Sequence, residues 1–335
     1  MCTRTSDKGP RLNTMSTTLG LINRLLLQPF GVENGQEAIT AAIQEFLGAN
    51  RDPTVVPKRP KRGEEDEDDM RAILATLESG GGRNGPLRVL LLKVLKVLLR
   101  KQSNRAALGR PAVQTLTTLM SSDGMDLVSC ECANVVLNMC YDAGNVQHFL
   151  EVGGVEALGP LVLSGNEHLK ASGLGALQSV CFDKPGRDAT RGSGLIGAVV
   201  RLLEDDSPKV RARALGTVHN LSTDARSIGI IREEGGLPRL VRLLRSHEAH
   251  VCGGAAGTIQ NLSREEKSRA LLLESFGAVE PLADLLVGRH VKSQISAAGA
   301  LVNIVGPDAR GSKRQLLHDV VTDGIVLGVI ESCMI

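Results

Sequence analysis

Aromatic side chains are nearly absent from this chain. Phe, Tyr and Trp make up 2% of the 335 residues, with no Trp and a single Tyr, Tyr141. Hydrophobic residues nevertheless reach 42%, so the core must be built from Leu, Val, Ile and Ala, which suits thin stacked layers. The lack of stacking aromatics, together with a net charge of only +2, argues against a generic nucleic-acid binder.

Long apolar runs are missing as well. No stretch of about 18 consecutive apolar residues occurs, so we expect no membrane-spanning helix. Asn23 and Arg24 interrupt the segment that a secretory signal would keep apolar, although a targeting role for roughly the first 15 to 30 residues stays open. The seven cysteines are odd in number and mostly lie within apolar runs, as is typical of reduced thiols. These features predict a cytoplasmic protein and leave a nuclear or cytoskeleton-associated location open.

What the chain does contain is an internal repeat. Residues 216–222 (GTVHNLS) and 257–263 (GTIQNLS) are almost identical and lie 41 residues apart. The asparagine of this heptapeptide recurs at spacings of 40, 42, 41 and 42 residues, with one replacement by glutamine: Asn138, Gln178, Asn220, Asn261 and Asn303. We refer to these five positions as the ladder.

A second signature keeps the same period. Segments with apolar residues at helical spacing begin at Asp69, Pro111, Gly153, Gly194, Gly235 and Gly277. Before the heptapeptide of residues 216–222, Ser207 and Pro208 have the order expected at the start of a helix. Two independent markers that share one period predict a helical solenoid.

Three helices in about 41 residues, a glycine hinge, an LV-x-LL helix and an A-x-x-x-L-x-N-L helix together resemble the armadillo repeat. The resemblance implies an all-α fold, a right-handed superhelix of about six repeats. We expect these repeats near residues 69–110, 111–152, 153–193, 194–234, 235–276 and 277–322, with a partial repeat at 323–335. Residues 1–68 are predicted to hold one capping helix, GQEAITAAIQEFLG, and a charged flexible linker.

The resemblance also implies a role for the ladder. In armadillo proteins the third helices line a concave groove, and their asparagines commonly bond the backbone of an extended peptide. One side-chain amide suits this task because it offers both a donor and an acceptor. The five ladder residues are therefore predicted partner-binding residues. A ladder asparagine could also bond a neighbouring carbonyl and tie one repeat to the next, and both interpretations stay open.

The chain departs from the importin-α branch of this family. That branch carries Trp one turn before the asparagine, whereas the corresponding residues here are Asn134, Leu174, Gly216, Gly257 and Gly299. Without Trp, capture of a lysine side chain by a cation–π contact is absent. The glycines are expected to leave the floor of the groove bare, with room for a bulkier ligand such as a helix.

Arginines gather in the fourth and fifth predicted repeats: Arg201, Arg211, Arg213, Arg239, Arg242 and Arg245. This cluster is either ordinary solvated helix surface or a docking patch for an acidic partner, whose attraction salt would weaken. Arg213 joins the ladder residues as a predicted partner-binding residue.

Few motifs resemble catalytic, cofactor-binding or metal-binding sites. Residues 192–197 (GSGLIG) match a dinucleotide-binding pattern, but no strand precedes them and Gly194 coincides with the glycine of the repeat. Cys130, Cys132 and His148 have no recognised metal spacing. We therefore expect no catalytic residue, no cofactor, no metal site and no small-molecule substrate.

One short basic segment could be a targeting signal. Residues 57–62 (PKRPKR) resemble a nuclear-localisation signal from Lys58 to Arg62, beside an acidic run that could shield it. The alternative is a solvated linker.

Together these patterns predict a non-catalytic scaffold or adaptor that binds a partner protein along its concave groove, without contacts to nucleic acid or membrane. Two alternatives stay open. One is a structural subunit of a large cytoskeletal or axonemal assembly. The other is a substrate-recruiting component of a ubiquitin-ligase complex, with the activity supplied by another chain.

Overall fold

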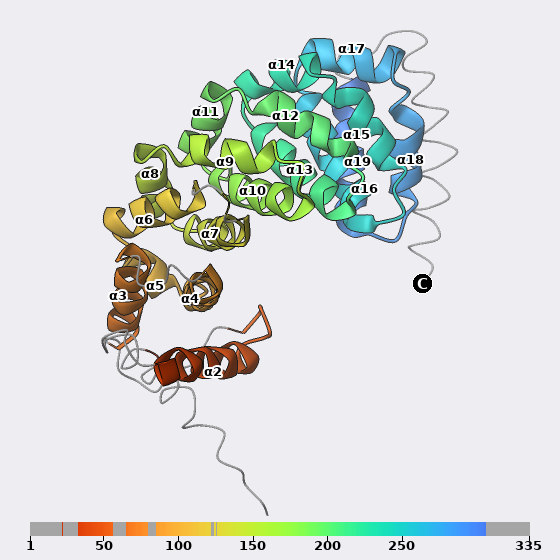
Figure 1. Cartoon of the computed structure of the whole chain (residues 1–335). Helices are drawn as coiled ribbons and strands as arrows, with labels where there is room; N and C mark the ends of the chain where they lie inside the picture. Colours follow the sequence, from red (N-terminus) through yellow and green to blue (C-terminus); the bar gives the residue numbers. More distant parts are fainter. Residues whose placement is uncertain are drawn as a thin grey trace, which may run out of the picture. The chain divides into compact units, whose positions relative to one another are not determined.

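The computed structural model describes residue 22 and residues 33–55, 65–79, 85–121, 124 and 126–305. Regular structure in these residues is entirely helical, with eighteen α-helices, one short 3-10 helix and no strand (Figure 1). The predicted all-α fold class is therefore confirmed. No helix among these residues is both long enough and apolar enough to span a membrane.

The chain divides into two compact units, one up to Ala157 and one from Leu158 on, with the boundary inside α9 (Gly154–Val162). The described helices that lie wholly in the first unit are α2 (Glu33–Ala49), α3 (Glu65–Glu78), α4 (Gly85–Leu98), α5 (Gln102–Ala106), α6 (Arg110–Met120), α7 (Asp126–Met139) and α8 (Ala143–Glu151).

In the first unit, α2 packs against α4, and α3 packs against α4 and α6. Helix α3 begins at Glu65, inside the stretch that the sequence predicts as linker. Its opening residues, EDEDD, are acidic, and negative charge stabilises a helix at its amino-terminal end, where the helix dipole is positive. The acidic half of the predicted linker therefore belongs to a helix.

The second unit repeats a motif of a short helix, a middle helix and a long helix. After α10 (Glu167–Val180) it contains α11 (Lys184–Gly192), α12 (Ile196–Arg201) with η1 (Leu202–Glu204), α13 (Pro208–Leu221), α14 (Ala225–Glu233), α15 (Gly236–Leu244), α16 (Ala249–Leu262), α17 (Glu266–Glu274), α18 (Val279–Leu286) and α19 (Val291–Val305). The long helices α10, α13, α16 and α19 pack one against the next in chain order (Figure 1).

A glycine with positive φ separates the short helix from the middle helix in each repeat. The φ angles are 72°, 74°, 76° and 59° at Gly153, Gly194, Gly235 and Gly277. Glycine adopts this left-handed conformation at little cost because it has no Cβ. The predicted hinge is confirmed at all four positions.

The core of the second unit consists mainly of aliphatic side chains, as the composition predicts. On α13 the apolar stripe of Val210, Ala214, Leu215, Val218 and Leu221 is at most 4% exposed. The Ser207 side chain caps this helix by accepting a hydrogen bond from the Val210 backbone N–H at 3.4 Å, and Pro208 is the first helical residue. The helix begins where the sequence predicts.

Candidate partner-binding groove

Ladder asparagines near the carboxyl ends of the long helices link neighbouring repeats. Asn220 Nδ2 donates to the backbone carbonyl of Gln178, one repeat earlier, at 2.8 Å. The same bond, at 3.0 Å, recurs from Asn138 to the carbonyl of Lys96 and from Asn303 to the carbonyl of Gln260. The tie between repeats is thus present at three ladder positions, and its acceptor is a helix carbonyl.

The fourth ladder asparagine is placed differently. Asn261 is only 8% exposed, and its Nδ2 donates to the hydroxyl of Ser222 at 3.0 Å. Ser222 directly follows α13 and belongs to the preceding repeat. This tie is therefore a buried hydrogen bond between two side chains, and it leaves little of Asn261 at the surface.

Gln178 and Arg213 contact each other. Arg213 Nη1 donates to Gln178 Oε1 at 3.4 Å, so a cation on α13 is held beside the ladder residue of α10. The Gln178 amide lies directly over Gly216, since a Cβ at Gly216 would be 2.4 Å from Gln178 Nε2. Both predicted residues therefore belong to one cluster.

The glycines one turn before the ladder are covered, contrary to the expectation of a bare floor. Besides Gly216, a Cβ at Gly299 would lie 2.1 Å from Gln260 Nε2, and one at Gly257 would lie 3.2 Å from the His219 ring. Each glycine accommodates a side chain from the preceding repeat. The absence of a Cβ therefore serves the packing of neighbouring repeats.

A cavity of about 780 Å³ nevertheless lies over the long helices of the second unit. We call it the groove. It is lined by Gln178, Ala212, Leu215, Gly216, His219, Asn220, Ala249, His250, Gly253, Gly254, Gly257, His290, Val291, Lys292, Ser293 and Ser296. Two ladder residues, Gln178 and Asn220, are among them. Burial lowers the pKa of the lining residue His219, so its ring is uncharged at neutral pH.

The other arginines of the predicted cluster are bonded within the unit. Arg211 donates to the backbone carbonyls of Asp205 and Asp206, at 2.7 and 3.0 Å. The remaining four form ion pairs between repeats: Arg201 with Glu234 at 3.3 Å, Arg239 and Arg242 with Glu204, and Arg245 with Glu280 at 2.8 Å. Four of the six charges are thus neutralised, which disfavours a docking patch spread over the whole cluster.

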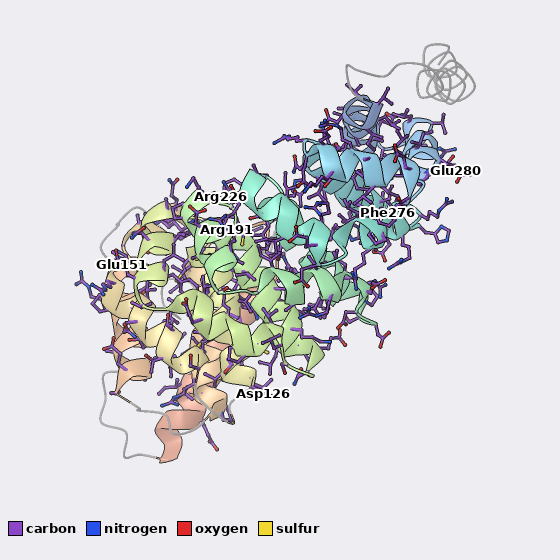
Figure 2. The ribbon with its side chains drawn as sticks, turned by 90° about the horizontal axis from the view of Figure 1, so that it is seen from above. Asp126, Glu151, Arg191, Arg226, Phe276 and Glu280 are labelled. Atoms are coloured by element: carbon purple, nitrogen blue, oxygen red, sulfur yellow. The ribbon has the colours of Figure 1, made fainter. Side chains whose placement is uncertain are left out.

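A second ion cluster joins α11 to α14. Asp188 pairs with Lys184 at 2.7 Å, with Arg191 at 2.6 Å and with Arg226 at 3.2 Å, and Arg191 also pairs with Asp224. Figure 2 shows Arg191 and Arg226 next to each other. Hydrogen bonds from Lys184 and Arg191 lower the pKa of Asp188 to about 2. These charges hold neighbouring repeats together.

The residues of the candidate cofactor and metal motifs have roles in the packing of the fold. Gly194 is a hinge residue with positive φ, which accounts for its place in the GSGLIG pattern. Cys130 and Cys132 are buried, and desolvation raises the pKa of the Cys132 thiol far above its usual range. Within the described part of the chain, no three His, Cys, Asp or Glu side chains form a group that could hold a metal ion. The basic segment from Lys58 to Arg62 lies outside the described residues.

Comparison with known proteins identifies the repeat. The family model of the armadillo/beta-catenin-like repeat matches residues 224–264, which contain α14, α15 and α16. The chain therefore contains an armadillo repeat. In the matched segment this armadillo repeat starts with the short helix, so its boundary precedes the hinge glycine at which the sequence signature begins. No curated protein matches the chain.

Engineered proteins are among the solved structures with a similar fold. One, described as an engineered protein, has a TM-score of 0.65 and 22% identity over 69% of this chain and 96% of its own. A designed armadillo repeat protein in complex with the peptide (KR)4 has a TM-score of 0.56 and 19% identity over 85% and 99%. A computationally designed armadillo repeat protein for modular peptide recognition has a TM-score of 0.63 and 20% identity over 70% and 99%.

Sequence reasoning did not single out Gln260 or Lys292. Gln260 and His219 each directly precede a ladder residue, and each covers the glycine four residues before the next ladder residue. A residue that directly precedes the ladder, followed one repeat later by a glycine, is therefore a sequence signal that could have identified Gln260. Lys292, in the first turn of α19, has no comparable signal in the armadillo repeat.

Replacing Asn220 with alanine is expected to lower the free energy of unfolding of the second unit by about 1 kcal/mol, because the part-buried Gln178 carbonyl loses its donor. Asn220→Asp should cost more, about 2 kcal/mol, since a carboxylate cannot donate to that carbonyl and repels it. Urea unfolding followed by far-ultraviolet circular dichroism measures both. An aspartate variant as stable as the wild type would contradict the assigned bond.

Proposed function

We propose that this armadillo-repeat protein is a non-catalytic scaffold that binds a partner protein in the groove of its long helices. The observation that carries the proposal is the cavity of about 780 Å³ over α13, α16 and α19. Its lining of amides, glycines, serines and short apolar side chains is suited to holding a polypeptide. The predicted partner contacts are at Gln178, Asn220 and Arg213 in or beside the groove, and at Asn138 and Asn303 elsewhere along the ladder.

The ladder retains capacity for a ligand while it ties the repeats. Asn220, Asn138 and Asn303 each use one amide N–H in a tie, and their Oδ1 atoms accept no hydrogen bond from the described residues. A free N–H and a free carbonyl oxygen can bond the backbone of a partner whatever its side chains. Asn261 contributes less to this proposal, because it is buried against Ser222.

The engineered relatives support the same conclusion by likeness of fold. One is described in complex with a peptide, and another is described as built for modular peptide recognition. Their sequence identity to this chain is only 19% and 20%, so they support a peptide-binding kind of surface but do not indicate its ligand.

Filling the groove tests the proposal. Ala212 and Ala249 line it, and Ala212→Trp combined with Ala249→Trp would place two large rings in the space of the partner. Tagged full-length chain is used to capture proteins from an extract of the cells that make it. We expect the filled variant to lose a captured partner at least about ten-fold, which corresponds to ~1.4 kcal/mol.

The control is Ala225→Trp, at an exposed position of α14 that does not line the groove. All variants must keep the wild-type circular dichroism spectrum and melting temperature. If the filled variant captures the same proteins as the wild type and the control, the proposed function is wrong.

A further inference from the structure

The groove is one-sided in charge. Among the described residues that line it there is no aspartate and no glutamate, while Lys292 and three histidines are present. At the rim, His250 Nε2 lies 3.4 Å from a carboxylate oxygen of Glu248. An uncompensated cation in such a surface attracts negative charge and repels positive charge.

Two permanent cations in or beside the groove lack a carboxylate partner among the described residues. Arg213 donates to the neutral amide of Gln178, and it forms no ion pair with a described residue. Lys292 is exposed, lines the groove and likewise forms no ion pair within the described part of the chain. By contrast, Arg201, Arg239, Arg242 and Arg245, outside the groove, are all paired with glutamates of neighbouring repeats. The unit therefore leaves positive charge uncompensated at the groove.

The amino-terminal end of α19 reinforces this charge. The groove lies over the beginning of α16, whose N-cap residue is the acidic Glu248, and over the beginning of α19, which has no acidic residue in its first turn. The positive end of a helix dipole adds to the attraction for an anion, although the effect is modest and falls off within one turn. The His219 ring is neutral by burial, so Arg213 and Lys292 carry most of the charge.

We propose that the groove takes up an acidic segment of a partner protein, with Asp or Glu side chains facing Arg213 and Lys292. This inference rests on the proposed function and names the chemistry of its ligand. The lining amides of Gln178 and Asn220 suit a polypeptide backbone, and the described lining residues include no Phe, Tyr or Trp on which a nucleic-acid base could stack. The preferred ligand is thus opposite in charge to the peptide (KR)4 of the designed relative.

The test is a selection from a displayed library of random peptides against the full chain. Peptides of about twelve residues span ~40 Å when extended, at ~3.3 Å per residue. We expect enriched peptides to be rich in Asp and Glu, to lose affinity when salt is raised, and to be blocked by the groove-filling tryptophans. Arg213→Gln and Lys292→Gln should each weaken binding about five-fold, since a partly exposed charge pair contributes ~1 kcal/mol.

Arg245→Gln is the matched control. It removes the same charge from an exposed arginine that pairs with Glu280 and does not line the groove, and it should leave the affinity unchanged. Enrichment of basic or uncharged peptides that the tryptophans block would overturn the acidic ligand and leave the proposed function standing. Failure to enrich any peptide that the tryptophans block would overturn both. Tighter groove binding by an oligonucleotide of equal charge would overturn the choice of a protein ligand.

Discussion

Replacing Phe149 with alanine is expected to lower the free energy of unfolding of the first unit by about 4 kcal/mol. Phe149 is fully buried in α8, and it heads the largest buried side chains of the described residues. Its ring packs on the backbone of Gly154, where a Cβ would lie 2.4 Å from two ring carbons. Removing the ring deletes this contact and leaves a cavity in the core.

Phe182→Ala is the control, because Phe182 is 75% exposed and its loss should change stability by less than about 0.5 kcal/mol. Urea unfolding gives the free energies, and hydrogen exchange measured on peptides from α6 and α8 shows whether the loss is in the first unit. Equal effects of the two substitutions would contradict the placement of Phe149 in the core.

The second large effect is expected at Gly186, in α11. Gly186→Ala should destabilise the second unit by about 3 kcal/mol, because a Cβ there would lie 1.9 Å from the backbone carbonyl oxygen of Val180. The obstructing atom belongs to the backbone of α10, so a change of rotamer cannot relieve the clash. One of the two helices must shift, and the contacts between them are lost.

Gly192→Ala is a matched control in the same helix. No heavy atom lies within 4 Å of a Cβ at Gly192, so alanine should be neutral or slightly stabilising through its higher helix propensity. Thermal unfolding followed by circular dichroism suits both variants. If Gly186→Ala proved as harmless as Gly192→Ala, the close approach of α11 to the end of α10 would be refuted.

The repeat itself could be predicted from the sequence because it depends on local signals. A glycine at each hinge and an apolar stripe on each helix are visible without any partner, and the φ angles at Gly153, Gly194, Gly235 and Gly277 agree with them. The burial of the Val210 to Leu221 stripe follows from the same periodicity.

The partners of the polar residues could not be predicted, because each lies about one repeat away. The Asn220 amide bonds a backbone carbonyl, which has no sequence signal of its own. Arg242 pairs with Glu204, and a search at helical spacing within one helix does not find that residue. Hence the sequence could not decide whether a ladder asparagine ties two repeats together or contacts a partner. Nor could it decide whether the clustered arginines are ordinary solvated surface or a docking patch.

The glycines before the ladder show the same limit. Their spacing was evident, but whether a glycine leaves a space or receives a neighbour depends on the side chain of another repeat. At Gly216 that side chain is Gln178 and at Gly299 it is Gln260, both long enough to cover the position. The sequence therefore pointed to two residues that line the groove, Gln178 and Asn220, but it could not show that the glycines beside them are covered.

The ties of the ladder have a consequence for how such a chain can change its length. The bonds of Asn220, Asn261 and Asn303 reach back 42, 39 and 43 residues, so each repeat is bonded only to its neighbour. Insertion or deletion of one complete period would leave every remaining tie with an acceptor, whereas the insertion of a few residues into a long helix would shift all later side chains out of register. Duplication of a whole repeat is thus the step by which this architecture can become longer without needing a new core.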